Sequence, residues 1–311
     1  MNISVTFSDN TTCQESLRVD KQLGQGKFSV FQVYSASRKG NYALKVFPKS
    51  RLGTSLYEKE QRFSNFSHPN IIRQIPVSSN HNEFHAHLTE LAKFGDFFDV
   101  VNESMLNNNE VLIRSYFRQL VEGVEHIHSQ GVAHLDLKLE NLMLGTDFQL
   151  KIIDFDQAQL MSDEAIESRG TKNYRAPEVS KGAGKDFASA DVYSMGVILY
   201  ALLVGEFPFL EDGEKSPENN SSYGQFNTNN QAFWSEKTQT NNESIYFSQD
   251  FMDLINGMLS ANVEQRFTIQ DIKSSKWYNG AVLDNKELKA EMRANWNAVM
   301  RKREEKTENC Y

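Results

Sequence analysis

The pattern of apolar residues changes near residues 91–95, and this change constrains the fold more than any other feature of the sequence. Before it, alternating and β-branched runs predict strands at 17–23, 29–36, 40–47, 71–76 and 83–88. A helical pattern interrupts these strands at 55–66. After the change, apolar residues at helical spacing predict helices at 111–131, 188–204 and 251–259. We therefore expect an α+β fold with two lobes, a small β-rich lobe with one main helix and a larger helical lobe.

Composition and charge are those of an ordinary globular chain. Of the 311 residues, 39% are hydrophobic, and the formal net charge of -8 disfavours nucleic-acid binding. The longest apolar stretch, 192–204, falls short of the roughly 18–20 residues that a membrane helix needs, so we expect a buried core helix and no membrane partner. Cys13 and Cys310 lack metal-ligand spacing, and no secretory signal precedes them. These features predict a reducing compartment and a cytoplasmic protein, with nuclear entry left open.

Two segments stand apart from this pattern. Residues 211–244 are crowded with Asn, Gln, Ser and Thr, which predicts a mobile surface insertion with few apolar anchors. In the tail, 280–311, charges alternate around apolar residues over 286–306, which predicts an amphipathic helix. We favour a helix that packs its apolar stripe on the C-terminal lobe. A calmodulin-target or autoinhibitory helix is the alternative, and interspersed acidic residues such as Glu291 weaken the calmodulin case.

One short stretch, His134-Leu135-Asp136-Leu137-Lys138-Leu139-Glu140-Asn141, combines a carboxylate, an amine and a carboxamide. These groups suit phosphoryl transfer, because one can accept a hydroxyl proton, one can steady phosphate charge and one can ligate a metal. Asp154 follows thirteen residues after Asn141, behind a strand-like run. A carboxylate there could hold Mg²⁺ against phosphates.

With these motifs the chain resembles the eukaryotic protein kinase family over about 17–277, in that family's order and spacing. The resemblance implies a catalytic domain over 17–279 after an N-terminal extension of 1–16, with an N-lobe of about 17–90 and a C-lobe of about 96–279. It also implies ATP and Mg²⁺ as cofactors and proteins as substrates. Lys138 places the loop on the Ser/Thr side of the family. The hinge, the Phe233-Trp234 pair and the helix at 251–259 look most like the calcium/calmodulin-dependent kinase group.

The same resemblance implies an ATP site. Lys45 would grip the α- and β-phosphates, Thr89 would be a small gatekeeper, and Asp96 would either meet the ribose or cap the next helix. Backbone groups of Glu90 and Ala92 would pair with adenine. The implied ATP-binding residues are Leu23, Gly24, Gln25, Gly26, Lys27, Phe28, Ser29, Val30, Phe31, Ala43, Lys45, Glu60, Thr89, Glu90, Ala92, Asp96 and Met143.

The helical partner of Lys45 is ambiguous in the sequence. The family places a glutamate nine residues before the His of a His-Pro-Asn-Ile segment, here His68. Glu60 lies eight residues before His68 and Glu58 lies ten before it, so neither matches the spacing. We favour Glu60, with Glu58 as the alternative.

The remaining implied roles concern chemistry and support. Asp136 would be the catalytic base and Lys138 would stabilise the transferring phosphoryl group. The other implied residues are the metal ligands Asn141 and Asp154, the substrate-facing Glu140 and Thr171, and the structural residues Glu178, Asp191 and Arg266. Glu178 would pair with Arg266, Asp191 would anchor the catalytic-loop backbone, and Glu140 favours a basic residue near the phosphorylated site.

Three departures from the family bear on function. Leu135 replaces the arginine that normally binds a phosphate on the activation segment, which predicts activity without phosphate on Ser162, Ser168 or Thr171. Asp156 replaces a glycine after Asp154-Phe155, which stiffens a backbone hinge and adds negative charge near the metal site. Ser29 replaces the third glycine of the loop over ATP.

These departures motivate an alternative function, a pseudokinase scaffold that binds partners without phosphoryl transfer. Against it, Lys45, Asp136, Asn141 and Asp154 are all retained, and their joint presence suits chemistry. A small-molecule kinase of related fold is a second alternative. It is disfavoured because the Ala176-Pro177-Glu178 segment belongs to members that act on proteins.

Overall fold

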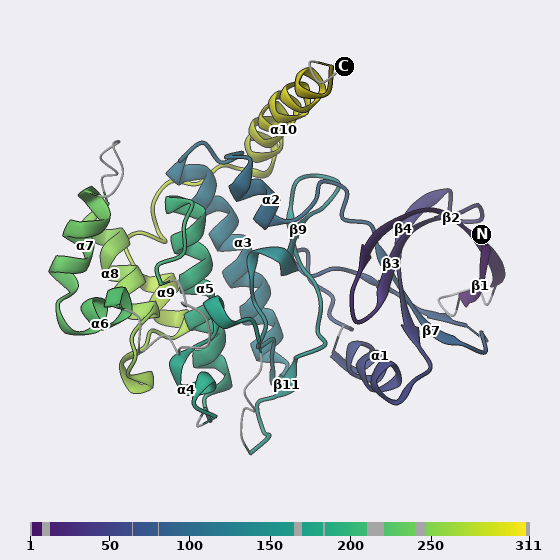
Figure 1. Ribbon diagram of the computed structural model, residues 1–311, viewed down its shortest axis with the longest axis horizontal. Helices are drawn as coiled ribbons and strands as arrows, with labels where there is room; N and C mark the ends of the chain where they lie inside the picture. The colour runs from purple at the N-terminus through teal and green to yellow at the C-terminus, as the bar shows by residue number, and fades with distance from the viewer. Residues whose placement is uncertain are drawn as a thin grey trace.

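Two lobes make up the molecule in the computed structural model, which describes residues 2–7, 13–63, 65–79, 81–164, 170–182, 184–209, 221–239 and 247–308. Figure 1 shows a strand-rich lobe that contains the N-terminus and a larger helical lobe joined to it. The predicted α+β bilobal fold is confirmed.

The N-terminal lobe is built on an antiparallel seven-stranded sheet in the order β5-β7-β4-β3-β2-β1-β6. Four of its strands lie close to the predicted runs, namely β2 (Cys13–Gln25), β3 (Ser29–Ser35), β4 (Gly40–Pro48) and β7 (Phe84–Glu90). The remaining strands are β1 (Asn2–Phe7), β5 (Gln74–Ile75) and β6 (Val77–Ser78).

The first of these strands closes the sheet. β1 pairs with β2, with Ile3 opposite Leu17, and on its other side Phe7 lies opposite Val77 of β6. Because β5 and β6 are successive pieces of one segment, and β5 pairs with β7, the sheet returns on itself and appears as a ring in Figure 1. The expected N-terminal extension therefore contributes a strand to the lobe's core.

Helix α1 (Arg51–Phe63) packs against β4 and β7 and begins earlier than the helix predicted at 55–66. Its start lies against the end of β4, where a Cβ at Gly53 would come within 2.0 Å of the Pro48 carbonyl oxygen. The buried residues of α1 are Gly53, Leu56, Glu60 and Phe63. This spacing places them on one helical face, and that face is turned toward the sheet.

The C-terminal lobe is helical around α5 (Phe187–Val204), which is buried nearly all round. The other helices of this core are α2 (Phe97–Asn102), α3 (Glu110–Ser129), α4 (Pro177–Ser180), α8 (Gln249–Met258) and α9 (Ile269–Ser274). By length and composition α5 alone among the described helices could cross a membrane, but 83% of it is buried inside the protein. It is the core helix that the sequence predicted.

Two pairs of short strands and three 3₁₀ turns flank the loops that contain the candidate site residues. β8 (Val132–Ala133) pairs with β11 (Gln159–Leu160), and β9 (Leu142–Leu144) pairs with β10 (Leu150–Ile152). The 3₁₀ turns are η1 (Leu139–Asn141), η2 (Lys172–Tyr174) and η4 (Val263–Gln265). Residues 134–141 and 153–156 lie side by side, because a ring nitrogen of His134 lies 3.0 Å from the Ile153 carbonyl and the Ile153 N–H donates to the Asn141 carbonyl at 3.0 Å.

The polar segment differs from its prediction. Residues 221–239 form α6 (Ser221–Thr228) and α7 (Asn230–Gln239), whose buried aromatic side chains are Tyr223, Phe226, Phe233 and Trp234. This stretch differs from the expected surface insertion, because its few apolar residues are large aromatic side chains that pack into the C-lobe core. The rest of 211–244 lies outside the described residues.

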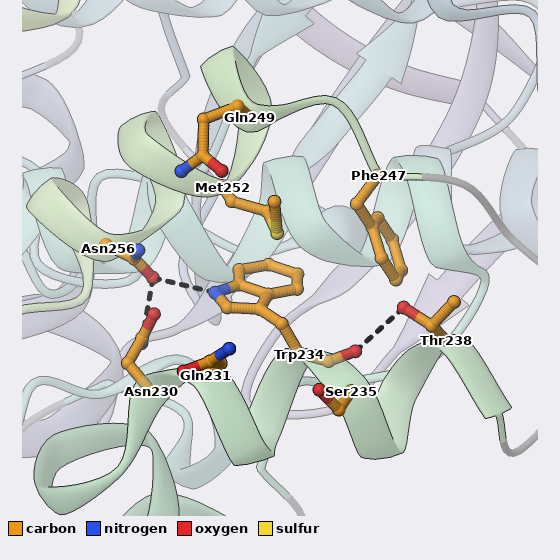
Figure 2. A pocket seen from close by; sticks show the side chains of 9 residues that line it. All are labelled: Asn230, Gln231, Trp234, Ser235, Thr238, Phe247, Gln249, Met252 and Asn256. Atoms are coloured by element: carbon orange, nitrogen blue, oxygen red, sulfur yellow. Dashed lines mark hydrogen bonds between the residues drawn. The ribbon is translucent and has the colours of Figure 1, made fainter.

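Trp234 shows how this segment is held. Figure 2 shows its indole beside Met252, with Nε1 donating to Asn256 Oδ1 at 3.0 Å. Asn230 donates to the same oxygen at 3.0 Å. Polar side chains of α7 and α8 line a cavity of about 590 Å³ beside the indole. The indole also packs against the rings of Tyr200, Phe233 and Phe251.

The tail forms α10 (Asn285–Glu308), which projects from the C-lobe in Figure 1. Its apolar stripe is buried, with Leu288, Met292 and Val299 each under 10% exposed. Trp296 meets Phe94 edge-on, with ring centroids 5.2 Å apart. The stripe therefore packs on the lobe and on the connection between the lobes, which is the arrangement we favoured over a calmodulin-target helix.

Candidate active site

Lys45 and Glu60 form a buried ion pair between β4 and α1. Lys45 Nζ lies 2.8 Å from Glu60 Oε1 and 3.4 Å from Asp154 Oδ1. Burial alone would lower the pKa of Lys45, but the two carboxylates outweigh it and raise that pKa above its ordinary value. Lys45 is therefore a fixed positive charge at the back of the cleft. Glu58 is exposed and takes no part in this pair.

A histidine that the sequence did not single out lies beside this pair. His87 of β7 is fully buried opposite Lys45, with Nδ1 3.8 Å from Glu60 Oε1, and neither ring nitrogen has a hydrogen-bond partner among the described residues. Burial, and then the Lys45 ammonium, lower the pKa of His87 to about 3. His87 is therefore uncharged and packs against the Lys45–Glu60 ion pair.

Asp154 is held in a strained backbone conformation just beyond β10. Its φ of 66° lies in the left-handed region, which is costly for a residue with a side chain. The next residue fixes this geometry, since Phe155 is fully buried between Phe66 and His134. The Phe155 N–H also donates to Glu60 Oε2 at 3.2 Å. Glu60 therefore joins Lys45 to the backbone that presents Asp154.

The carboxylate of Asp136 is the centre of a compact polar network. Its Oδ1 accepts from the Thr171 hydroxyl at 2.9 Å, and its Oδ2 accepts from Lys138 Nζ at 2.8 Å and Asn141 Nδ2 at 3.2 Å. Lys138 also donates to Thr171 Oγ1 at 2.9 Å. The structure thus brings Asp136, Lys138, Asn141 and Thr171 together within hydrogen-bond distance.

Asp191 explains how the loop backbone is held. It is fully buried at the start of α5, and it accepts from the backbone N–H groups of His134 and Leu135, both at 2.8 Å. A ring nitrogen of His128 lies 2.8 Å from the same carboxylate. These contacts stabilise Leu135 at a φ of 60°, a conformation that its side chain disfavours.

The activation segment crosses this loop at Gly170. A Cβ at Gly170 would lie 2.6 Å from the Leu135 carbonyl oxygen, and its φ of 79° is itself suited to glycine. The Leu135 side chain is buried, so the position that carries an arginine in the family here joins the apolar core. Ser168 lies outside the described residues, while Ser162 and Thr171 lie within them.

A second buried ion pair supports the end of this segment. Arg266 donates from both terminal nitrogens to Glu178, at 2.6 Å and 2.9 Å, and also to the carbonyls of Ser189 and Ser260. Such a bidentate pair fixes orientation as well as distance. The pair lies away from the cleft and braces α4 against the C-lobe.

The nucleotide cleft is a cavity of about 300 Å³ between the lobes. It is lined by residues implied to bind ATP, namely Leu23, Gly24, Phe28, Val30, Ala43, Lys45, Thr89, Glu90, Ala92, Asp96 and Met143. Others implied by the resemblance do not line it, namely Gln25, Gly26, Lys27, Ser29, Phe31 and Glu60. The predicted ATP-binding residues did not include the lining residues Ile72, Leu91 and Ile153. Leu91 lies between the hinge residues Glu90 and Ala92, whereas Ile72 and Ile153 have only their apolar character as a signal.

Two details refine the adenine and ribose ends of the cleft. The Glu90 N–H donates to the Arg73 carbonyl at 2.9 Å, so a contact from Glu90 to adenine would come from its carbonyl. Asp96 caps α2 by accepting from the Asp99 N–H at 2.9 Å and also lines the cavity. Burial raises the pKa of Asp96 despite this cap. Asp96 therefore caps α2 and faces the cleft at the same time, so the two roles predicted for it are compatible.

Asn141 and Asp154 offer oxygen donors that fit a hard cation such as Mg²⁺. Within the described ranges there is no cluster of three or more His, Cys, Asp or Glu side chains that could hold a metal by itself. Mg²⁺ usually takes one or two protein oxygens and completes its shell with phosphates and water. The donor set is therefore the kind that binds Mg²⁺ together with a nucleotide.

Comparison with known proteins agrees with this geometry. The sequence model described as the protein kinase domain matches residues 17–278. The chain is 33% identical to CBL-interacting protein kinase 24 of Oryza sativa subsp. japonica, over 84% of this chain and 56% of that protein. It is 32% identical to serine/threonine-protein kinase chk-1 of Caenorhabditis briggsae, over 85% of this chain and 53% of that protein.

A third relative, serine/threonine-protein kinase SIK1 of Mus musculus, is 31% identical over 83% of this chain and 32% of that protein. The chain spans about half the length of the first relatives it matches. These relatives agree with the expected Ser/Thr type and are consistent with the expected calcium/calmodulin-dependent kinase group.

Proposed function

The chain belongs to the protein kinase family, and from that premise we propose that it transfers the γ-phosphoryl group of ATP to serine and threonine hydroxyls of proteins. The observation that carries the proposal is the joint placement of two groups of residues. Lys45 is paired with Glu60 and reaches Asp154. The Asp136 network is joined to the segment that carries Asp154, because Asn141 donates to Asp136 and accepts at its carbonyl from the Ile153 N–H at 3.0 Å. A scaffold that only binds partners has no need of both.

In this proposal Asp136 orients the acceptor hydroxyl and takes its proton as the new oxygen–phosphorus bond forms and the bond to the leaving ADP oxygen breaks. Lys138 lies 2.8 Å from Asp136 and would steady the charge of the transferring group. The Thr171 hydroxyl bonds to both residues, so it marks where an acceptor hydroxyl would approach. Positioning and fixed charge supply most of the catalysis.

The nucleotide would be held from both lobes. Lys45 contacts the phosphates from the sheet, and the backbone of Glu90 and Ala92 meets adenine at the other end of the cleft. Asn141 and Asp154 would hold Mg²⁺, which when bound supplies positive charge against the phosphates.

We also propose that activity does not depend on phosphate in the activation segment. The buried Leu135 cannot bind a phosphate, whereas the family's arginine at that position would. Asp191, Gly170 and Arg266 would order this part of the site in place of an added charge.

The preferred substrates would carry a basic residue near the acceptor. Glu140 is exposed at the edge of the catalytic loop and lines the same cleft as Asp96. A basic residue of the substrate would be attracted to the Glu140 carboxylate, and this attraction would position the substrate along the cleft. Rates on matched peptides that differ only by Arg or Gln before the acceptor serine would test this preference, and equal kcat/KM values would contradict it.

The experiment that tests the activity is transfer from labelled ATP to a basic serine peptide in the presence of Mg²⁺. We expect transfer by the parent chain and loss of transfer in Asp136→Ala. Transfer by the parent that does not exceed that of Asp136→Ala would contradict the proposal and favour the scaffold. Binding of ATP by both proteins would show that each has folded.

A further inference from the structure

Lys27, at the tip of the glycine-rich loop, reaches across the cleft to Asp156. Lys27 Nζ lies 2.9 Å from Asp156 Oδ2, although the two residues are 129 positions apart in the chain. Asp156 is only 3% exposed, and it stands where the family has a glycine. A buried carboxylate in this place needs a reason, because taking a charge out of water is costly unless it is paired.

Lys27 is the only group paired with the Asp156 carboxylate among the described residues. The Lys27 side chain itself is 57% exposed, so the ammonium enters the cleft from the solvent side. The hydrogen bond to Asp156 raises the pKa of Lys27 most strongly, and the charges of Asp156, Asp154 and Asp136 add to it. Its charge therefore faces the same carboxylates that surround the phosphoryl-transfer site.

The neighbour of Lys27 holds the loop down as well. The Phe28 ring lies 4.8 Å from Lys45 Nζ and packs on Phe47, with centroids 4.9 Å apart. Phe28 also lines the nucleotide cavity. The loop tip thus lies over the end of the cleft where Lys45 and Asp154 meet, and Lys27 ties that tip to the lower lobe.

We propose that Lys27 and Asp156 form a clasp between the lobes, which holds the glycine-rich loop over the phosphate end of the cleft and cancels the negative charge that Asp156 brings beside Asp154. Both are positioning residues, since they act on the loop and on the local charge. The inference rests on the proposed nucleotide site, and it explains how a carboxylate is tolerated at a position where phosphates must approach.

The alternative is that Lys27 contacts the phosphates on its own and Asp156 merely stiffens the hinge. The two explanations differ in whether the effect of losing Lys27 on nucleotide binding depends on the residue at position 156. In the clasp, loss of Lys27 leaves an unpaired carboxylate near the phosphates, so its effect depends on Asp156. If Lys27 acts alone, its loss weakens nucleotide binding by the same factor whatever residue stands at 156.

A double-mutant cycle on the full chain tests this coupling. The variants are Lys27→Met, Asp156→Gly and the double variant, and the readout is the Kd for Mg²⁺-ATP measured by calorimetry. We expect Lys27→Met to raise Kd at least about fivefold in the parent and less than about twofold in the Asp156→Gly background. Lys27→Arg should keep the parent Kd within about twofold, because its charge can still pair. Lys21→Met, an exposed lysine on β2, is the matched control.

An equal factor in both backgrounds, or no effect of Lys27→Met at all, would overturn the clasp. When transfer is measured on the same variants, the clasp predicts a change in KM for ATP and little change in kcat. The binding readout needs no turnover, so the two proposals can fail separately. A parent chain that transfers no phosphate but shows the coupling in Kd contradicts the proposed function and leaves the clasp standing.

Discussion

Glu60 of α1 lies 2.8 Å from Lys45 of β4, and its second oxygen accepts from the backbone N–H that follows Asp154. One buried carboxylate thus connects the sheet, the helix and the segment that carries the candidate metal ligand. The helical phase explains why Glu60 takes this place, since it shares a face with Gly53, Leu56 and Phe63, while Glu58 points outward.

Glu60→Gln should lower kcat/KM about 100-fold or more, because Lys45 loses its charged partner and the Asp154 segment loses an anchor. Glu58→Gln, two residues away on the exposed face, is the matched control and should change kcat/KM less than about twofold. Steady-state rates with ATP and a basic peptide provide the measurement. A larger loss in Glu58→Gln than in Glu60→Gln would show that Glu58, and not Glu60, is the functional partner of Lys45.

Some residues of the candidate site are close together in the sequence, whereas others meet only through the fold. Asp136, Lys138 and Asn141 lie within six residues, so a short motif brings them together with little help from the fold. The choice between Glu58 and Glu60 needed the helical phase, which the shifted spacing to His68 obscured. The contact of Lys27 with Asp156 spans 129 positions and has no local signal.

Two features of the N- and C-lobes had weak signals in the sequence, for physical reasons. Within 1–16 we expected only an extension, because the alternation of Ile3, Val5 and Phe7 with polar residues is short and its partner strands could not be identified from the sequence. In 221–239, the abundance of Asn, Gln and Ser concealed aromatic residues that are few but large. Aromatic side chains bury so much area that a few can anchor a polar helix.

Phe7→Ala should lower the free energy of unfolding by about 3–5 kcal/mol, because Phe7 is 1% exposed in the core of the closed sheet. Ser4→Ala, on the exposed face of the same strand, should change it by no more than about 0.5 kcal/mol. Denaturant unfolding measures both variants. Similar small effects at the two positions would mean that β1 is a dispensable extension.

Gly170→Ala should lower the free energy of unfolding by about 1–2 kcal/mol, because alanine disfavours the positive φ. It should also lower kcat about tenfold to 100-fold, because the new Cβ would press on the Leu135 carbonyl. Gly182→Ala provides a matched control. Its φ is also positive, but its Cβ would meet nothing within 4 Å. It should therefore lose only the stability that the positive φ costs and keep its kcat. Equal losses of kcat in both variants would contradict the effect of the segment crossing.

The buried His87 predicts a loss of stability in acid. Its pKa is about 3 in the folded chain, against an ordinary value of 6.5. The unfolded chain therefore binds a proton that the folded chain does not, and stability falls as the pH drops from about 6.5 toward 3. Between pH 7 and pH 5 this single group contributes a loss of about 2 kcal/mol.

His87→Leu, which keeps the volume and removes the proton site, should flatten this dependence by about the same amount. Denaturant unfolding of the parent and the variant at pH 7 and pH 5 measures the difference. An unchanged pH dependence in His87→Leu would mean that the imidazole is protonated in the folded chain or that its pKa is close to that of the unfolded chain.

In the proposed mechanism the Asp136 network transfers phosphate without help from a phosphorylated activation segment. The most direct measurement is the initial rate of phosphoryl transfer to a basic serine peptide by chain treated with phosphatase, with mass spectrometry showing no phosphate on Ser162, Ser168 or Thr171. We predict a rate within about twofold of the untreated chain, and a loss of about 100-fold or more in Asp136→Asn. A rate that disappears with the phosphate, or one no higher than that of Asp136→Asn, would contradict the claim.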